Sequence, residues 1–208
     1  KTFETATSGI NDGFLFNAPL LIDPNEPRRL FAGGTRLWRS IDRAVSWTGA
    51  SQPLPVQQGR ISALGIARSD SNRMMIGTEQ GFLIRNTRAL DSAAETAPEF
   101  VTRPRTGFVT GIAFDPADAE IVYAVYSTYK TSPDQHHVYR SDNGGFTWHG
   151  IDGEGETGLP DIPVLSVLVD PDDGRRIFLG TDIGVFVSLD GGVTWLRDQG
   201  SFANVVTE

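Results

Sequence analysis

The chain has 208 residues, of which 39% are hydrophobic and 21% charged, and its formal net charge is -8. This balance is typical of a globular domain and excludes a chain that is disordered throughout. The acidic balance argues against a nucleic-acid partner, because phosphate binding needs a concentrated basic surface. The absence of cysteine excludes disulfides and thiolate metal sites, and no apolar run reaches the roughly 20 residues that cross a bilayer.

Short apolar runs separated by glycine and proline fill the sequence, which contains 23 Gly and 12 Pro. Such runs are typical of brief strands joined by tight turns, and no segment keeps a helical period over several turns. An apolar strand closing on Asp-Pro or a similar turn recurs about every 46 residues, with a longer third step. We expect these strands at residues 19–23, 61–69, 109–115 and 164–170.

Each apolar strand is followed by two more runs that predict a hairpin. The second strands are expected at residues 29–32, 73–76, 121–126 and 176–179, and the third strands at 37–40, 81–85, 138–141 and 184–188. A repeat of this length matches one four-stranded blade of a β-propeller. The sequence therefore predicts an all-β fold, a β-propeller of four-stranded antiparallel blades, with about four blades of a six- to eight-bladed ring. The expected blades are 18–52, 61–100, 109–160 and 163–200, with 1–7 ending a preceding blade and 202–208 starting a following one.

An eight-residue motif follows three of the third strands. Its serine, aspartate or asparagine, glycine, hydroxyl and tryptophan positions are filled by Ser188, Asp190, Gly192, Thr194 and Trp195, by Ser141, Asn143, Gly145, Thr147 and Trp148, and in a weaker copy by Ser40, Asp42 and Trp47. A short hairpin needs positive φ at its glycine, and a short acidic or amide side chain can accept hydrogen bonds from the turn's own amides. We expect these residues to be structural, with the tryptophan between blades. The second repeat has lost the motif, and we align Arg85, Thr87 and Ser92 with its serine, aspartate and tryptophan positions.

These motifs and the Gly-Thr pairs at 34–35, 77–78 and 180–181 resemble the Asp-box, or bacterial neuraminidase repeat, β-propellers. Sialidases, xyloglucan-degrading glycosidases, the sortilin-type receptor domain and a photosystem assembly factor share such repeats, so the resemblance implies a fold more firmly than a reaction. It implies a non-catalytic scaffold that binds glycan or protein within a larger bacterial protein, secreted or periplasmic. The alternative is part of a sialidase-like or xyloglucanase-like glycoside hydrolase. The implied partner is the rest of the parent propeller or a second chain, with no cofactor, metal, nucleic acid or membrane.

Ligands of propellers usually meet the loops between second and third strands and between blades. The candidates there are Arg36, Arg60, Glu79, Arg105, Tyr129, Lys130, His137 and Asp182, and Asp12 and His136 lie in the same loops. A sialidase-like site needs three converging arginines, a tyrosine with a glutamate base and an acid. These residue types are present without the Arg-Ile-Pro context of sialidases, so the sequence assigns no catalytic residue.

Two loops of the third repeat stand out. The acidic run Asp152, Glu154, Glu156 and Asp161 is interpreted as a solvated loop, with a weak calcium site as the alternative. His136 and His137 are interpreted as part of an exposed loop, since adjacent residues of an extended segment point to opposite sides. The insertion at 127–135, with Tyr129 and Lys130, is the longest departure from the repeat and is predicted to be a contact region.

Overall fold

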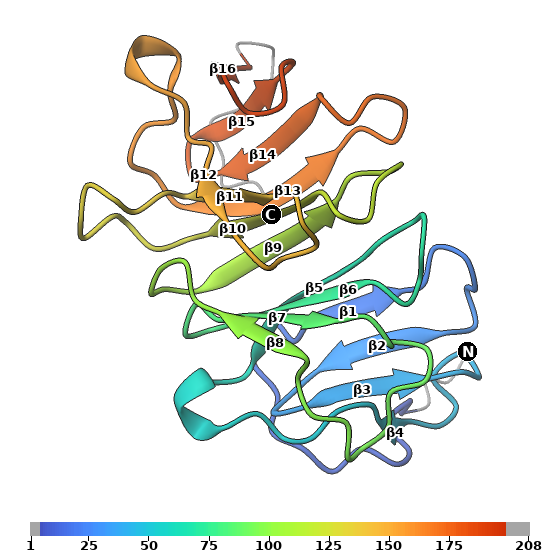
Figure 1. The fold of residues 1–208 in the computed structure, drawn as a ribbon. Helices are drawn as coiled ribbons and strands as arrows, with labels where there is room; N and C mark the ends of the chain where they lie inside the picture. The colour runs from blue at the N-terminus through green and yellow to red at the C-terminus, as the bar shows by residue number, and fades with distance from the viewer. Residues whose placement is uncertain (1–4, 199–208) are drawn as a thin grey trace.

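The computed structural model describes residues 5–198, and these form four antiparallel sheets of four strands each (Figure 1). Each sheet uses four consecutive strands in chain order, so each is one propeller blade. The expected all-β fold of four-stranded antiparallel blades is confirmed. The expected fifth inner strand at 202–208, and most of the expected outer strand at 1–7, lie outside the described residues.

The strand bounds follow the repeats. The first blade contains β1 (Leu20–Ile22), β2 (Leu30–Gly33), β3 (Leu37–Ser40) and β4 (Thr48–Gly49), and the second contains β5 (Ile61–Ile66), β6 (Met74–Thr78), β7 (Leu83–Asn86) and β8 (Phe100–Thr102). The third contains β9 (Val109–Phe114), β10 (Val122–Tyr126), β11 (Val138–Ser141) and β12 (His149–Gly150), and the fourth β13 (Val164–Val169), β14 (Ile177–Thr181), β15 (Gly184–Ser188) and β16 (Leu196–Arg197). The connections between blades carry the 3-10 turns η1 (Val56–Gln58) and η2 (Gly155–Thr157). No helix among residues 5–198 is long and apolar enough to cross a membrane.

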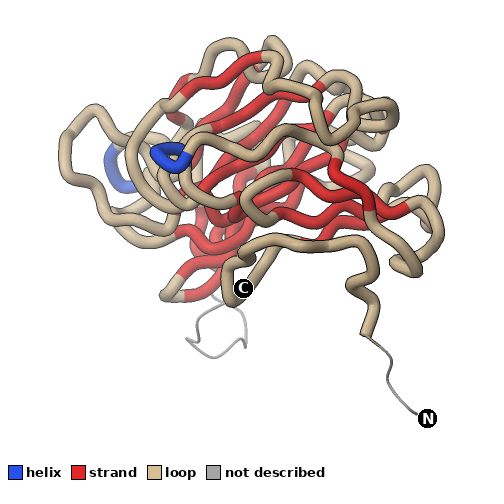
Figure 2. The backbone as a smooth tube through the Cα atoms, turned by 90° about the horizontal axis from the view of Figure 1, so that it is seen from below, coloured by secondary structure: helices blue, strands red, loops and turns tan. Residues whose placement is uncertain are grey.

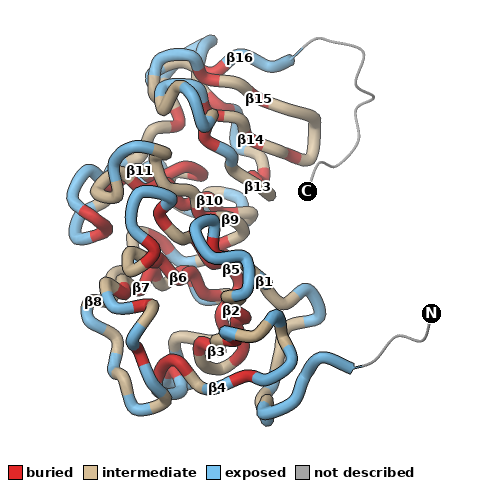
Figure 3. The backbone as a smooth tube through the Cα atoms, turned by 90° about the vertical axis from the view of Figure 1, so that its right-hand side faces the viewer, coloured by how far each residue is buried: buried red, intermediate tan, exposed pale blue. Residues whose placement is uncertain are grey.

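The blades follow one another with the first and the fourth at opposite ends (Figure 3), and loops surround the central strands (Figure 2). The innermost strands β1, β5, β9 and β13 run side by side and line a concave surface. The buried side chains gather between neighbouring blades rather than inside one sheet. Phe31, Ile61 and Met74 pack at the first junction, Met75, Val109 and Val122 at the second, and Tyr123, Ile177 and Phe186 at the third.

Two glycines let the second strand of one blade approach the inner strand of the next blade closely. A Cβ atom on Gly33 would collide with Ile61, and one on Gly77 would collide with Val109. Each glycine ends or nearly ends a second strand, and each clash partner begins the inner strand of the next blade. A side chain at either position would push two blades apart, because close-packed cores have no room for an extra methyl group.

The turns that join third and fourth strands at 41–47, 142–148 and 189–195 share one hydrogen-bond pattern. In the fourth blade the Ser188 hydroxyl donates to Asp190 and accepts from the Gly192 amide, while Asp190 Oδ1 accepts from the Thr194 amide at 2.9 Å. The third blade repeats these contacts from Ser141 and Asn143, and the first from Ser40 and Asp42. The polar side chains thus satisfy the amides that a tight turn leaves free.

The backbone of these turns needs positive φ at two consecutive residues. Glycines fill both positions in the third and fourth blades, with φ of 78° at Gly191 and 94° at Gly192. The first blade uses Arg43 and Ala44 instead, at 62° and 66°. Residues with a Cβ adopt this region at a cost of roughly 1–2 kcal/mol each, so the first-blade turn is strained.

The second blade differs from its expected alignment by one residue. Asn86 pairs with Met74 at the start of β6, as Ser40 pairs with Leu30 at the start of β2. Asn86, rather than Arg85, therefore takes the serine position, and Glu99, just before β8, stands where the other blades have tryptophan. The hairpin between β6 and β7 is one residue longer than that between β14 and β15, since the Thr78 amide bonds to Phe82 whereas Thr181 pairs with Gly184, and this shifts the serine position. The longer connection 87–99 shifts the tryptophan position, and there Glu99 accepts from Thr87.

The three motif tryptophans differ in their surroundings. Trp47 and Trp195 are buried, and their indole nitrogens donate to carbonyls of the segment that precedes the blade, Ala6 for Trp47 and Ile151 for Trp195. Trp148 is half-buried and donates to Gly145 of its own turn at 3.1 Å. The expected position between blades is therefore occupied most fully by Trp47 and Trp195.

Candidate functional site

The candidate ligand residues lie on the face opposite the three turns described above. The loops between second and third strands and the connections between blades lie on this face, because the four antiparallel strands of each blade alternate in direction. The structure brings Arg105, Tyr129, Lys130 and His137 together at the third blade. Arg36, the Arg60–Glu79 pair and Asp182 lie in loops of other blades.

Arg60 and Glu79 bind each other across the start of the second blade. Glu79 Oε1 accepts from the Arg60 amide at 2.9 Å and from Arg60 Nε at 3.2 Å, and Arg60 Nη1 donates to the Phe14 carbonyl at 3.1 Å. Burial raises the pKa of the Glu79 carboxyl, but these donors outweigh it and hold the pKa below its ordinary value. Glu79 is therefore charged at neutral pH and occupied by Arg60.

Arg36 and Asp12 lie at the first blade. Asp12 accepts from the Thr35 amide at 2.9 Å and from Trp38 Nε1 at 2.8 Å, so it fixes the N-terminal segment to this blade. The Arg36 guanidinium lies 5.8 Å from the centre of the Trp38 ring, within range of a cation–π contact.

Arg105 is buried and bound by main-chain oxygens. Its guanidinium donates to the carbonyls of Thr106, Thr128, Tyr129 and His136 at 2.9–3.0 Å. Three of these carbonyls belong to the connection between β10 and β11. Arg105 therefore holds that connection against the one between the second and third blades, and its side chain faces protein rather than solvent.

The acidic run and the histidines meet in the same place. Asp152 is buried and accepts from the amides of His137 and Val138, both at 2.9 Å, and Lys130 Nζ lies 2.6 Å from its carboxylate. Asp161 Oδ1 contacts His137 Nε2 at 2.8 Å and accepts from the Lys130 amide at 3.0 Å. Burial lowers the pKa of the His137 imidazole, and Asp161 offsets this in part.

We call Arg105, Lys130, His137, Asp152 and Asp161 the latch, because together they fasten the insertion to the connections that precede and follow the third blade. The interpretation of Asp152 as part of a solvated loop, and of His137 as exposed, is wrong. A carboxylate is stable in a buried position only with donors around it, and the insertion folds back to supply them. Within residues 5–198 no group of three His, Cys, Asp or Glu residues could hold a metal ion. Tyr129 stays exposed and Asp182 half-buried.

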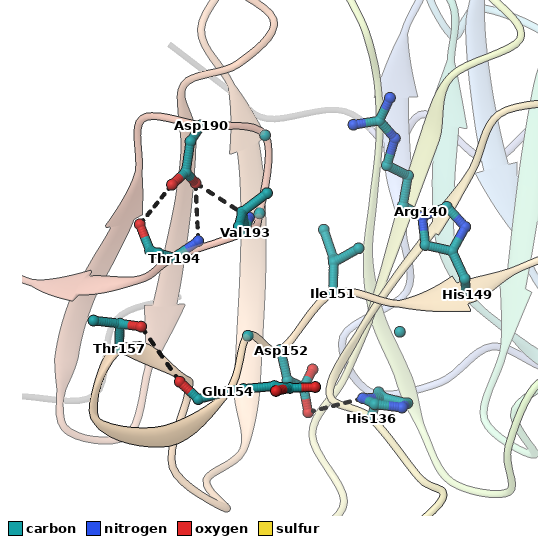
Figure 4. A pocket seen from close by; sticks show the side chains of 14 residues that line it. His136, Arg140, His149, Ile151, Asp152, Glu154, Thr157, Asp190, Val193 and Thr194 are labelled. Carbon is teal, nitrogen blue, oxygen red and sulfur yellow. Dashed lines mark hydrogen bonds and ion pairs between the residues drawn. The ribbon is translucent and has the colours of Figure 1, made fainter.

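A cleft of about 640 Å³ opens at the outer rim between the third and fourth blades (Figure 4). One side is formed by the 189–195 turn and the connection before the fourth blade, and the other by the outer strands of the third blade. The lining residues are His136, Arg140, His149–Glu154, Thr157 and Asp190–Thr194. Asp190 is engaged in its own turn, and Ile151 lies between the two sides of the cleft.

Sequence reasoning missed Arg140 and His149. A recurring signal was present, because Arg39, Arg85 and Arg140 each precede the last residue of a third strand. The fourth blade has Val187 at that position.

Comparisons with known proteins give relatives of the same fold. No protein-family model matches the chain. The xyloglucanase Xgh74A of Acetivibrio thermocellus is 35% identical over 109 residues, which are 46% of this chain and 12% of that enzyme. The crystal structure of an ancestral GH74 enzyme superposes with a TM-score of 0.69 at 22% identity, over 94% of this chain and 25% of that one. The GH74 xyloglucanase from Xanthomonas campestris gives 0.67 at 17% identity, over 93% and 32%. The chain thus resembles a β-propeller part of much longer proteins.

Proposed function

We propose that the chain is part of an Asp-box repeat propeller that acts as a non-catalytic binding scaffold for glycan or protein. The supporting observation is that charged side chains of the ligand face are bound by the protein itself. Glu79 binds Arg60, Arg105 donates to four main-chain carbonyls, and Asp152 binds Lys130 and two amides. A glycosidase needs a pair of carboxyl groups that are free to act on a bound sugar.

The Asp-box assignment is supported by the turns themselves. Three of the four blades use the same serine hydroxyl and the same aspartate or asparagine oxygen to bind turn amides. These side chains lie away from the face of the candidate ligand residues. We assign them to architecture, because their hydrogen-bonding capacity is used within the turn.

A second function, part of a glycoside hydrolase, is favoured by one observation. The sequence match over 109 residues is to a xyloglucanase. In that case Glu79 and Asp182 are the carboxylates of the ligand face to consider, since Asp152 is buried in the latch. A second carboxylate would have to stand across a bound sugar, at the roughly 5–10 Å that glycosidases use.

The experiment incubates the chain with xyloglucan and with a panel of aryl glycosides. Hydrolysis is measured as the release of reducing ends and of aryl alcohol. The expected result is no turnover, together with retention of the chain on at least one immobilised glycan or protein ligand. Turnover that disappears in Glu79→Gln or Asp182→Asn, and persists in the matched change Asp172→Asn on the opposite face, would establish the hydrolase instead.

The partner and compartment belong to the same proposal. We propose that the rest of a parent propeller, or a second chain, covers the outer faces of the first and fourth blades, and that the protein is secreted or periplasmic. The superposition on a quarter to a third of longer propeller enzymes supports the first part.

A further inference from the structure

The three junctions between blades are built from equivalent residues, so they can be compared position by position. Strand register makes Arg85 of β7 equivalent to Arg140 of β11, since Arg85 pairs with Met75 and Arg140 with Tyr123. Phe100 pairs with Arg85 as His149 pairs with Arg140. These positions face the next blade at the outer rim.

A phenylalanine ring lies at the outer rim of the junction between the second and third blades and is 45% exposed. Phe146, from the turn of the third blade, packs against Phe100 with ring centres 5.1 Å apart and an interplanar angle of 59°. The Arg85 guanidinium lies 4.4 Å from the centre of the Phe146 ring. The ring is therefore held between an aromatic neighbour and a cation, which is a favourable arrangement for its quadrupole.

The same positions at the next junction lack that ring. Val193 takes the place of Phe146, five residues after the serine of its turn, and is 68% exposed. His149 takes the place of Phe100. Figure 4 shows Val193 on one side of the cleft and Arg140 with His149 on the other. The cleft therefore includes the space that a phenylalanine occupies one blade earlier, and we call this space the slot.

The cation of this slot is already in place. Arg140 Nε and Nη2 lie 2.8 and 2.7 Å from Asp142 Oδ1, and His149 Nδ1 lies 3.7 Å from the other oxygen of the same carboxylate. Asp142 thus holds both the guanidinium and the imidazole from the side. A pre-placed guanidinium and imidazole lower the entropy that binding would cost.

We propose that this cleft binds an aromatic side chain, phenylalanine or tyrosine, presented by an extended segment of a protein partner. The ring enters between Arg140 and His149, as Phe146 lies between Arg85 and Phe100. The volume of about 640 Å³ exceeds one ring, so neighbouring residues of the segment lie along the rim. There the outer strand β12 presents its free edge, and Glu154 and Thr157 supply polar groups.

A protein segment fits this cleft better than a sugar does. Sugar rings are commonly held against the flat faces of tryptophan, tyrosine or phenylalanine, and none of these lines the cleft. What it offers is a guanidinium and an imidazole, which favour an aromatic occupant over a saturated ring. The cleft runs along the outer rim, from the 189–195 turn to the connection 151–157 that ends on the ligand face.

The test titrates the isotopically labelled chain with blocked pentapeptides that carry Phe, Tyr, Leu or Ala at the centre, and separately with a xyloglucan oligosaccharide. Binding is measured by NMR as changes in the amide chemical shifts. We expect the Phe and Tyr peptides to shift the amides of Arg140, His149 and Val193 and to bind about tenfold more tightly than the Ala peptide. Val193→Phe should fill the slot, abolish these shifts and raise the Tm. Leu189→Phe, a matched change on the same turn outside the cleft, should leave binding unchanged.

A second variant keeps the proposal testable if Val193→Phe disturbs the turn. Arg140→Leu removes the cation and should erase the preference for Phe over Leu while leaving the spectrum folded. Equal binding of the Ala and Phe peptides, Phe binding that survives both variants, or shifts at the cleft with the oligosaccharide alone would each overturn the proposal.

Discussion

Arg85 Nε donates to the carbonyl oxygen of Gly144 at 3.0 Å, and so ties the second blade to the turn of the third. Arg39 makes the equivalent contact one blade earlier, from Nη1 to the Ala89 carbonyl at 2.8 Å. Both acceptors stand three residues after the side chain that closes the third strand, Asn86 for Ala89 and Ser141 for Gly144. The arginine is thus a repeated link between blades.

Arg85→Ala should destabilise the chain by about 1.5–3 kcal/mol, because a charge-assisted hydrogen bond and the cover over Phe146 are lost together. Urea unfolding measures the effect. The exposed Arg68→Ala should change stability by less than about 0.5 kcal/mol. Equal changes in the two variants would contradict a link between blades.

Ala44→Gly should stabilise the chain by about 1 kcal/mol, although glycine usually destabilises. Ala44 is held at φ 66°, where the other two turns have glycine, so the substitution removes backbone strain. The control is Ala117→Gly in an exposed loop, which lies at ordinary φ and should lose stability or stay unchanged. Thermal melts of the two variants would refute the strain if Ala44→Gly melted lower than the parent.

Asp190 should make the fourth-blade turn sensitive to acid. The hydrogen bonds from Thr194 hold its pKa at about 2, below the ordinary 3.8. Because the folded pKa is the lower one, the stabilisation is present above about pH 4 and is lost as the pH falls toward 2. The loss is modest because the carboxylate is exposed.

Asp190→Asn tests this directly, since Asn143 already serves the third-blade turn with an amide. The variant should stay folded at neutral pH and lose less stability than the parent between pH 4 and 2. Urea titrations across that range measure the difference, and parallel acid profiles would show that Asp190 makes no pH-dependent contribution.

The latch should protect the insertion from proteolysis. Trypsin cleaves after lysine, and Lys130 is held by its amide to Asp161 and by its Nζ to Asp152. Asp161→Ala should speed cleavage after Lys130 several-fold, because local opening then precedes the cut more often. Asp134→Ala, an exposed acid of the same insertion, is the matched control. Mass spectrometry of timed digests would refute the latch if both variants were cut at the same rate.

The fold could be predicted from sequence because its signals are local and repeated. Alternating short apolar runs and turn residues place the strands within about three residues of their observed bounds, as at 61–69 against Ile61–Ile66 and at 109–115 against Val109–Phe114. The turn contacts of Asp190 are local, because the Thr194 amide that donates to it lies four residues further along the chain. The alignment of the second repeat failed because its β6–β7 hairpin has one extra residue and its connection 87–99 is longer, and only pairing with β6 shows that Asn86 takes the serine position.

The site was harder to predict because it depends on contacts between distant residues. Nothing near Asp152 in the chain shows that Lys130 and the His137 amide lie beside it, so a run of acids between glycines predicted a solvated loop. Arg105 likewise gains three of its four carbonyl partners only when the connection between β10 and β11 folds over it. The cleft is open because Val193 stands where the preceding blade has the larger Phe146. The difference is seen only when the two junctions are compared.

The outer face of the fourth blade should drive self-association of the chain. Strand register aligns Leu168, Phe178, Val187 and Leu196 across all four strands of this sheet. Leu168 is 61% and Leu196 58% exposed, whereas Tyr123, the equivalent of Phe178 in the third blade, is buried against the fourth. The row lacks the linking arginine of the other blades, so it is apolar from the inner to the outer strand.

An exposed apolar row of this kind is typical of a surface that another sheet covers. The edge strand β16 has only two residues, so we expect association through the face rather than by strand addition. Light scattering on the purified chain should show association that grows with concentration and that weakens in Leu168→Thr combined with Leu196→Lys. Leu189→Lys, equally exposed but on a turn, should leave association unchanged. A monomer that melts cooperatively at all concentrations, with the same Tm in parent and double variant, would show that this face needs no partner.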